Sequence, residues 1–82
     1  MHRVIFTRRA LKDLEDLDKG EKSRIAEKLK EYARDPLTYA RKLIDSKIGT
    51  YRFRIGNYRL IFDVKDNDIV ILRIGHRKDI YR

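Results

Sequence analysis

The stretch GTYRFRIGNYRLIF, residues 49–62, alternates apolar and polar side chains around a turn, which is the pattern of a β-hairpin. With Gly56–Asn57 as a two-residue turn, the apolar side chains of both strands share one face. On the other face Arg54 then lies directly opposite Arg59, and Arg52 lies two positions from Arg54. Like charges opposed across a ladder are destabilising, so these arginines either form a solvated strand face or, as we favour, face an external anion that compensates for the repulsion.

The composition narrows the class of protein. A chain of 82 residues predicts one domain, residues 1–82, with a modest core. Cysteine is absent, which excludes a disulfide framework and a thiolate metal site. The first residues form no apolar signal segment, and the longest aliphatic run, residues 69–72, is too short to span a bilayer. We therefore expect a soluble cytoplasmic protein with no membrane partner.

The charge is strongly basic and unevenly distributed. The formal net charge is +8, and residues 41–82 hold 11 Lys and Arg against 5 Asp and Glu, whereas residues 1–40 hold 10 against 8. The high content of charged residues of both signs also fits a thermophile, but it does not explain the excess of one sign. An excess of this kind is typical of a protein that binds a polyanion, with nucleic acid the first candidate.

The hydrophobic periodicity predicts an α+β fold, with a helical hairpin packed on one face of a small, mostly antiparallel sheet. Thr7 is the expected N-cap of the first helix, Gly20 its left-handed C-cap, and Pro36 ends the second helix. Residues 37–48 receive no element. The expected order is β-α-α-β-β-β, at residues 3–6, 8–18, 21–34, 49–55, 58–64 and 69–75.

The C-terminal segment RIGHRKDIYR holds a second group of candidate site residues. His76 is a candidate general acid or base, since only histidine titrates near neutral pH without perturbation. Arg77 lies next to it, Lys78 and Arg82 add positive charge for nucleic-acid binding, and Tyr81 either stacks on a base or closes the edge of the core. Glycine-rich phosphate loops, histidine or cysteine metal spacings and a Ser-His-Asp arrangement are all absent, so we expect neither a metal nor a cofactor.

The order of elements, with the motifs YRFRIGNYRLIF and GHRKDIYR, resembles the RelE/ParE superfamily of toxins from type II toxin–antitoxin systems over essentially the whole chain. The resemblance implies the RelE-like microbial ribonuclease fold. RelE-like members cleave messenger RNA in the ribosomal A site, whereas ParE-like members inhibit DNA gyrase on the same scaffold.

The resemblance also implies roles for individual residues. Arg52 and Arg54 match basic residues that lie against the RNA backbone. Arg59 matches the arginine that holds the scissile phosphate, Arg77 the basic residue near the leaving group, and Tyr81 the C-terminal tyrosine.

The chain also departs from the pattern of its relatives. Some relatives place a glutamate base where this chain has Arg41 and Lys42, and several have lysine at positions 52 and 54. Arginine does not release its proton at physiological pH, so the identity of the base stays open and His76 is the strongest titrating candidate.

The sequence thus predicts a toxin that acts as a ribosome-dependent, metal-independent mRNA endoribonuclease. The expected partners are a wrapping RelB-like antitoxin, the ribosome and messenger RNA. Two alternatives stay open: a gyrase inhibitor on the same fold, and a basic RNA-binding module without catalysis.

Overall fold

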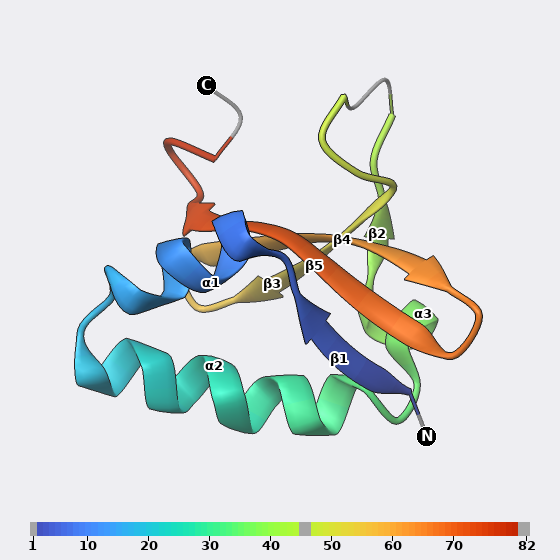
Figure 1. Cartoon of the computed structure of the whole chain (residues 1–82), viewed down its shortest axis with the longest axis horizontal. Coiled ribbons are helices and arrows are strands. Elements are labelled where there is room, and N and C mark those ends of the chain that lie inside the picture. The colour runs from blue at the N-terminus through green and yellow to red at the C-terminus, as the bar shows by residue number, and fades with distance from the viewer. Residues whose placement is uncertain (1, 45–46, 81–82) are drawn as a thin grey trace.

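A computed structural model describes residues 2–44 and 47–80, which form helices packed on a mixed sheet of five strands (Figure 1). The strand order is β1-β5-β4-β3-β2, with β1 parallel to β5 and the other neighbours antiparallel. In the described part of the chain, no helix is long and apolar enough to cross a membrane. The elements are β1 (Arg3–Phe6), α1 (Arg8–Glu15), α2 (Lys19–Tyr32), α3 (Pro36–Tyr39), β2 (Arg41–Lys42), β3 (Tyr51–Ile55), β4 (Tyr58–Lys65) and β5 (Asp68–His76).

This arrangement confirms the predicted fold class and adds two short elements, α3 and β2, that the sequence pattern did not reveal. The helix boundaries differ by two to three residues from those expected. The Thr7 hydroxyl accepts a hydrogen bond from the Ala10 N–H at 3.2 Å, so the predicted N-cap is confirmed.

The prediction for Gly20 was wrong, because this glycine lies in the first turn of α2. The Asp18 carboxylate accepts a hydrogen bond from the Glu21 N–H at 2.8 Å and thereby starts α2 earlier than expected. An aspartate that caps the N–H three residues along is a strong helix start signal, and it prevails over the glycine.

The predicted hairpin register is confirmed at every position of β3. Gly56 adopts a φ of 59°, which glycine reaches without the steric penalty of a side chain, and this allows the two-residue turn. Phe53 pairs with Leu60 on the side of the helices, and Arg54 pairs with Arg59 on the opposite side.

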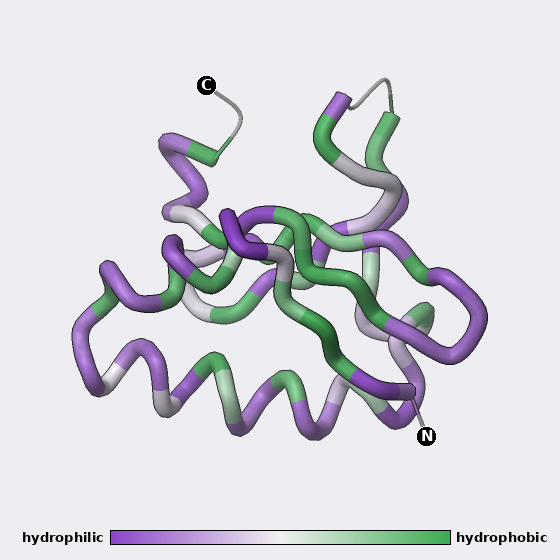
Figure 2. The backbone as a smooth tube through the Cα atoms, viewed as in Figure 1, coloured by the Kyte–Doolittle hydropathy of each residue, from purple (hydrophilic) through white to green (hydrophobic). Residues whose placement is uncertain are grey.

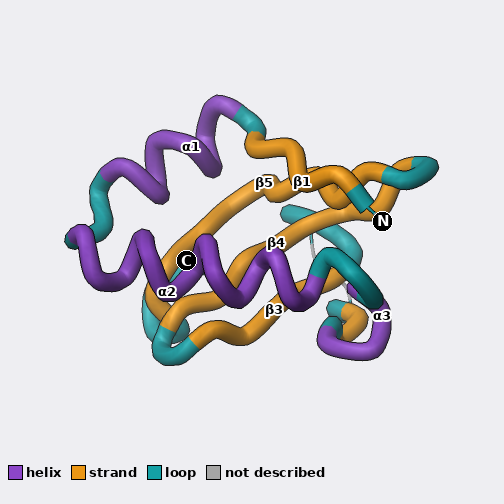
Figure 3. Tube along the Cα trace, turned by 90° about the horizontal axis from the view of Figure 1, so that it is seen from below, coloured by secondary structure: helices purple, strands orange, loops and turns teal. Residues whose placement is uncertain are grey.

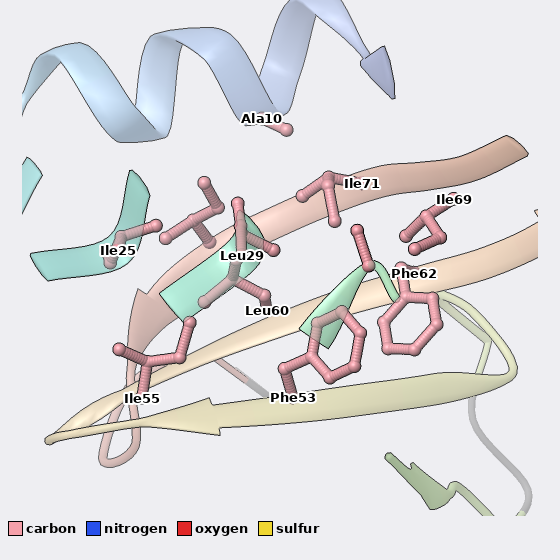
Figure 4. Close-up of a cluster of buried hydrophobic side chains, with 11 residues drawn as sticks. Ala10, Ile25, Leu29, Phe53, Ile55, Leu60, Phe62, Ile69 and Ile71 are labelled. Carbon is pink, nitrogen blue, oxygen red and sulfur yellow. The ribbon is translucent and has the colours of Figure 1, made fainter. Parts of the chain in front are cut away.

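The core lies between the sheet and the helices. Ala10 of α1 and Ile25 and Leu29 of α2 point toward apolar side chains of the strands, as Figure 4 shows. Figure 3 shows α2 lying across this face of the sheet, and in Figure 2 hydrophobic and hydrophilic residues alternate along α2, as expected for a half-buried helix. The buried residues contributed by the strands are Phe53, Ile55, Leu60, Phe62, Ile69, Ile71 and Ile74.

An irregularity in β5 settles the orientation of Arg73, which the sequence left open. Phe62 pairs with Ile71 and Ile61 with Arg73, so Leu72 is an extra residue that no residue of β4 opposes. Arg73 Nε donates to the carboxylate of Asp13 on α1 at 3.0 Å, and the same oxygen accepts the Ile74 N–H. Arg73 therefore fastens α1 to the sheet.

The opposed pair Arg54 and Arg59 generates a prediction about stability. Replacing Arg54 by Gln removes a repulsion across the ladder, so we expect the free energy of unfolding to rise by up to about 1 kcal/mol at low salt. Urea denaturation measures this difference. The gain should shrink toward zero in 1 M salt, where charges are screened within about 3 Å.

Arg54→Lys is the matched control, since it keeps the charge and the side-chain length. Equal stability of the Gln and Lys variants at low salt would show that the opposed arginines do not repel each other measurably.

Candidate functional site

Four arginines that form no ion pair within the described residues lie on the face of the sheet that turns away from the core, here called the arginine face: Arg41, Arg52, Arg54 and Arg59. They form two directly opposed pairs in neighbouring ladders, because Arg54 pairs with Arg59 and Arg41 pairs with Arg52. Directly opposed residues share a face. The sequence revealed only the first pair, and the second depends on the two-residue strand β2.

The arginine face lacks internal counter-charges. None of its four members forms an ion pair within residues 2–44 and 47–80. Arg52 Nη1 and Arg59 Nε are also buried without a hydrogen-bond partner. A buried N–H group without a partner costs free energy, and a guanidinium is charged at all physiological pH values. An external anion would supply the hydrogen-bond acceptors that these two nitrogens lack in the described structure.

The segment that leads into β3 and the segment that follows β5 border this face, on the side of the sheet opposite to α2 (Figure 1). At one end a Cβ atom on Gly49 would lie 2.7 Å from Leu72 Cδ1 and 2.8 Å from Ile61 Cγ2, so the backbone here rests directly on the sheet. At the other end a Cβ on Gly75 would lie 2.8 Å from Cδ1 of the buried Ile80. Both glycines provide space for a segment that folds over the sheet.

The C-terminal segment is held beside the hairpin turn by its backbone. The Arg77 N–H donates to the Asn57 carbonyl at 2.8 Å, and the N–H groups of Asp79 and Ile80 both donate to the His76 carbonyl. Gly75 pairs with Arg59, so Ile80 packs over the strand position next to this arginine. The side chains of Arg77 and Lys78 are exposed.

His76 lies differently from the arginines. It pairs with Tyr58, and their rings meet edge to face with centroids 5.7 Å apart. Since side chains alternate along a strand, this register puts His76 on the face of Tyr58 and Leu60, whereas Arg59 lies on the other face. Its Nδ1 accepts the Lys78 N–H at 3.2 Å, so the neutral ring carries its proton on Nε2.

The structure thus brings together some of the residues predicted from the sequence. Arg52, Arg54 and Arg59 share one face, the backbone of Arg77 lies at its hairpin end, and His76 and Lys78 form the tight turn that follows β5. Tyr81 and Arg82 lie outside the described residues.

Sequence reasoning missed Arg41 and its neighbour Tyr39, which line a pocket of about 210 Å³ together with Arg52 and Arg54. Both residues lie in the segment to which no element was assigned. The signal available in the sequence was the pair Arg41-Lys42, which precedes the strand that carries Arg52 and Arg54. Among residues 2–44 and 47–80, no group of three or more His, Cys, Asp or Glu side chains is placed to hold a metal ion.

The chain is similar to known proteins over almost its whole length. Residues 4–81 match the family model described as the ParE toxin of the type II toxin–antitoxin system parDE. Toxin RelG of Mycobacterium tuberculosis is 38% identical, over 96% of this chain and 94% of that protein. Toxin RelE3 of Methanocaldococcus jannaschii is 32% identical, again over 96% of this chain and 94% of that protein.

This chain is also similar to a protein of known structure. The crystal structure of the toxin–antitoxin complex RelBE2 from Mycobacterium tuberculosis contains a chain that superposes with a TM-score of 0.83 and 33% identity. The match covers 93% of this chain and 98% of the other. The chain therefore belongs to the RelE/ParE family of toxins from type II toxin–antitoxin systems.

Proposed function

We propose that this toxin is an endoribonuclease that cleaves messenger RNA on the ribosome. The observation that carries the proposal is the arginine face, with four arginines in two opposed pairs and no ion pair within the described residues. The names of the similar proteins, RelG and RelE3, support the RelE-like branch of the family. The name of the matching family model, a ParE toxin, keeps gyrase inhibition as the alternative.

The proposed reaction uses the nucleophile that RNA itself carries. The ribose 2′-oxygen loses its proton and attacks the adjacent phosphorus, the bond from phosphorus to the 5′-oxygen breaks, and that oxygen takes up a proton. The products are a 2′,3′-cyclic phosphate and a free 5′-hydroxyl. The protein then has to align the 2′-oxygen, stabilise the negative charge on the phosphorane and move two protons, with no metal ion in the scheme.

Arg59 is the proposed ligand of the scissile phosphate. It lies on β4, the central strand of the sheet, with Arg54 on one side and Gly75, over which Ile80 packs, on the other. Its buried Nε lacks a partner in the described structure, and a phosphate oxygen satisfies such a donor with a charge-assisted hydrogen bond. Arg77 is the proposed contact on the leaving-group side.

Basic residues away from the reacting phosphate are proposed to hold the RNA backbone. Arg52 and Arg54 extend the arginine face along β3, and Lys78 and Arg82 belong to the C-terminal segment. Tyr81 is proposed to stack on a base.

A comparison of variants separates chemistry from binding. Arg59→Ala should slow single-turnover cleavage by about 10²–10³-fold, the usual loss for one donor to a developing anion. Arg52→Ala and Arg54→Ala should mainly weaken RNA binding and reduce the log–log salt slope by about 0.7 each. Primer extension on a message translated in a cell-free system measures the cleavage, and titration at several salt concentrations measures the slope.

The same assay tests the proposed function as a whole. Cuts phased with codons support the ribonuclease. Intact message, together with gyrase-dependent changes in plasmid topology, would instead establish the gyrase inhibitor. Equal losses of affinity in all three variants, with unchanged cleavage at saturation, would reduce the arginine face to a passive basic surface.

His76 is proposed to carry a proton in the reaction, and its contacts define how this can occur. The ring accepts the Lys78 N–H at Nδ1, and an imidazolium cannot accept a hydrogen bond. Protonation of His76 therefore breaks the contact that closes the turn after β5. A role in proton transfer requires the ring to take up and release a proton, whereas a structural role requires Nδ1 to stay unprotonated.

Two substitutions distinguish these roles. His76→Asn keeps a side-chain oxygen that accepts the N–H two residues along but cannot titrate near neutral pH, whereas His76→Ala loses both properties. If His76 moves a proton, both variants should slow cleavage by about 10²-fold or more and lose the dependence of the rate on pH near neutrality. Single-turnover rates between pH 5.5 and 8.5 provide the measurement. Wild-type rates in the Asn variant would leave His76 only the structural role.

The proposed antitoxin partner requires a docking surface, and the surface we assign to it is an apolar groove beside α2. This groove measures about 540 Å³ and is lined by residues of β1, α1 and α2, among them Phe6, Leu14 and Leu29. Lys22, Lys30 and Arg34 also line it, all from α2 or just after its end. An apolar groove with basic residues at its border fits an amphipathic helix that carries acidic side chains. The solved relative from Mycobacterium tuberculosis is a toxin–antitoxin complex, which supports this occupant.

Ala26, an exposed residue that lines the groove, offers a test. Ala26→Glu puts a carboxylate into the apolar lining, and we expect it to weaken binding of the antitoxin encoded beside this gene by at least about tenfold, because burying an unpaired charge is costly. Isothermal titration measures the affinity, and Glu27→Gln is the control outside the groove. Unchanged affinity in the Ala26→Glu variant, with both proteins folded, would place the antitoxin elsewhere.

A further inference from the structure

The pocket at the β3 edge of the arginine face has properties that the proposed reaction does not require. It is lined by Tyr39, Arg41, Arg52 and Arg54, and its volume of about 210 Å³ is below the roughly 300–1,000 Å³ of sites for whole small molecules. It therefore suits a fragment of a larger ligand. Within the described residues, β2 pairs only with Tyr51 and Arg52, so no strand pairs with the outer edge of β3 from Phe53 to Ile55.

Tyr39 is held as a platform at this pocket. Its ring stacks on Tyr32, with centroids 4.5 Å apart and an angle of 15° between the planes. Tyr32 in turn contacts the buried Phe53, with ring centroids 5.1 Å apart. Tyr39 is nevertheless 44% exposed, since Tyr32 covers only one face of its ring. The orientation of the ring is thus fixed by the core while part of its surface stays available.

The three arginines supply the charge at the same pocket. Arg41 lies directly opposite Arg52, and Arg52 Nη1 is buried without a hydrogen-bond partner. Neither residue forms an ion pair in the described part of the chain. An anion here relieves the repulsion between the two guanidinium groups and provides acceptors that the protein does not.

We propose that this pocket is a second nucleotide subsite, in which Arg41 and Arg52 hold a backbone phosphate of single-stranded RNA and Tyr39 stacks on the adjacent base. The inference rests on the proposed function, because it assigns an RNA strand to the arginine face and extends it from Arg59 to the far edge of β3. Aromatic stacking next to phosphate-binding arginines is the general mode of single-strand recognition. Such a subsite fixes the position of the strand relative to the phosphate that is cleaved.

The chemistry of the pocket favours a nucleotide over an acidic protein segment. An aspartate or glutamate side chain also pairs with arginine, but it gains nothing from an exposed aromatic ring. The combination of a preoriented ring and opposed arginines within one small pocket matches a base and its phosphate.

The test measures binding of the folded toxin to a single-stranded oligoribonucleotide that is 2′-O-methylated throughout and therefore resists cleavage. Fluorescence anisotropy is recorded between 25 and 200 mM salt. Arg41→Ala should weaken binding and reduce the log–log salt slope by about 0.7, the value for one lost phosphate contact. Tyr39→Ala should weaken binding by about fivefold to hundredfold and leave the slope unchanged, because stacking releases no counterion.

Two further variants control for charge and folding. Tyr39→Phe keeps the ring and its stacking on Tyr32, so it should bind like the wild type. Lys28→Ala removes one positive charge from an exposed position on α2, across the sheet from the arginine face, and should also bind like the wild type. Circular dichroism of each variant confirms that the protein is folded.

The outcomes separate this subsite from the proposed reaction, which is followed in parallel by primer extension with the wild type. Wild-type binding and slope in both Arg41→Ala and Tyr39→Ala would overturn the subsite even if the message is cleaved. Loss of binding in these variants without any cleavage by the wild type would support a nucleic-acid subsite and refute the ribonuclease. If Arg41→Ala weakens only the antitoxin complex, the pocket contacts an acidic protein segment and the proposal is wrong.

Discussion

The two-residue turn at Gly56 fixes which side chains of β3 and β4 lie on each face of the sheet. Because side chains alternate, a slip of one residue would move Phe53 and Leu60 away from the helices and put Arg54 and Arg59 into the core. The apolar contacts with α2 oppose that slip. The same register that forms the core therefore also assembles the arginine face.

The arginine face holds like charges directly opposite each other on the side of the sheet away from the core. Arg54 and Arg59 are opposed in one ladder and Arg41 and Arg52 in the next, while a buried nitrogen in each of Arg52 and Arg59 lacks a partner. Local destabilisation of this kind is common at functional sites, where a ligand supplies the missing interactions. A surface made only of arginines stabilises negative charge well, but it does not exchange protons near neutral pH. Proton transfer therefore requires a different group.

Much of the fold could be predicted because strong local signals agreed. The alternation around Gly56 fixed β3 and β4, and Thr7 marked the start of α1. Gly20 misled because Asp18, two residues earlier, was a stronger start signal for α2. The extra residue Leu72 in β5 leaves no local trace in a run of apolar residues, so the partnership of Arg73 with Asp13 could not be predicted.

In the candidate site, too, the sequence predicted the residues that are neighbours along one hairpin and missed those that short, separate elements bring to it. Arg52, Arg54 and Arg59 lie within one hairpin, and their shared face follows from strand periodicity alone. Arg41 joins them only through the two-residue strand β2, and Tyr39 only through the turn of α3, both too short to leave a periodic pattern. His76 is next to Arg77 in sequence, but the register of β5 puts its side chain beside Tyr58, a contact that sequence proximity alone does not reveal.

The parallel pairing of β1 with β5 joins the two ends of the chain, because residues 3–6 lie beside residues 68–71. β5 is also an interior strand, with β1 on one side and β4 on the other. During synthesis, β1 therefore has no strand partner until β5 has been made, and contacts this distant in sequence form late in folding. The sheet of this toxin is therefore complete only once β5 has been made and has paired with both β1 and β4.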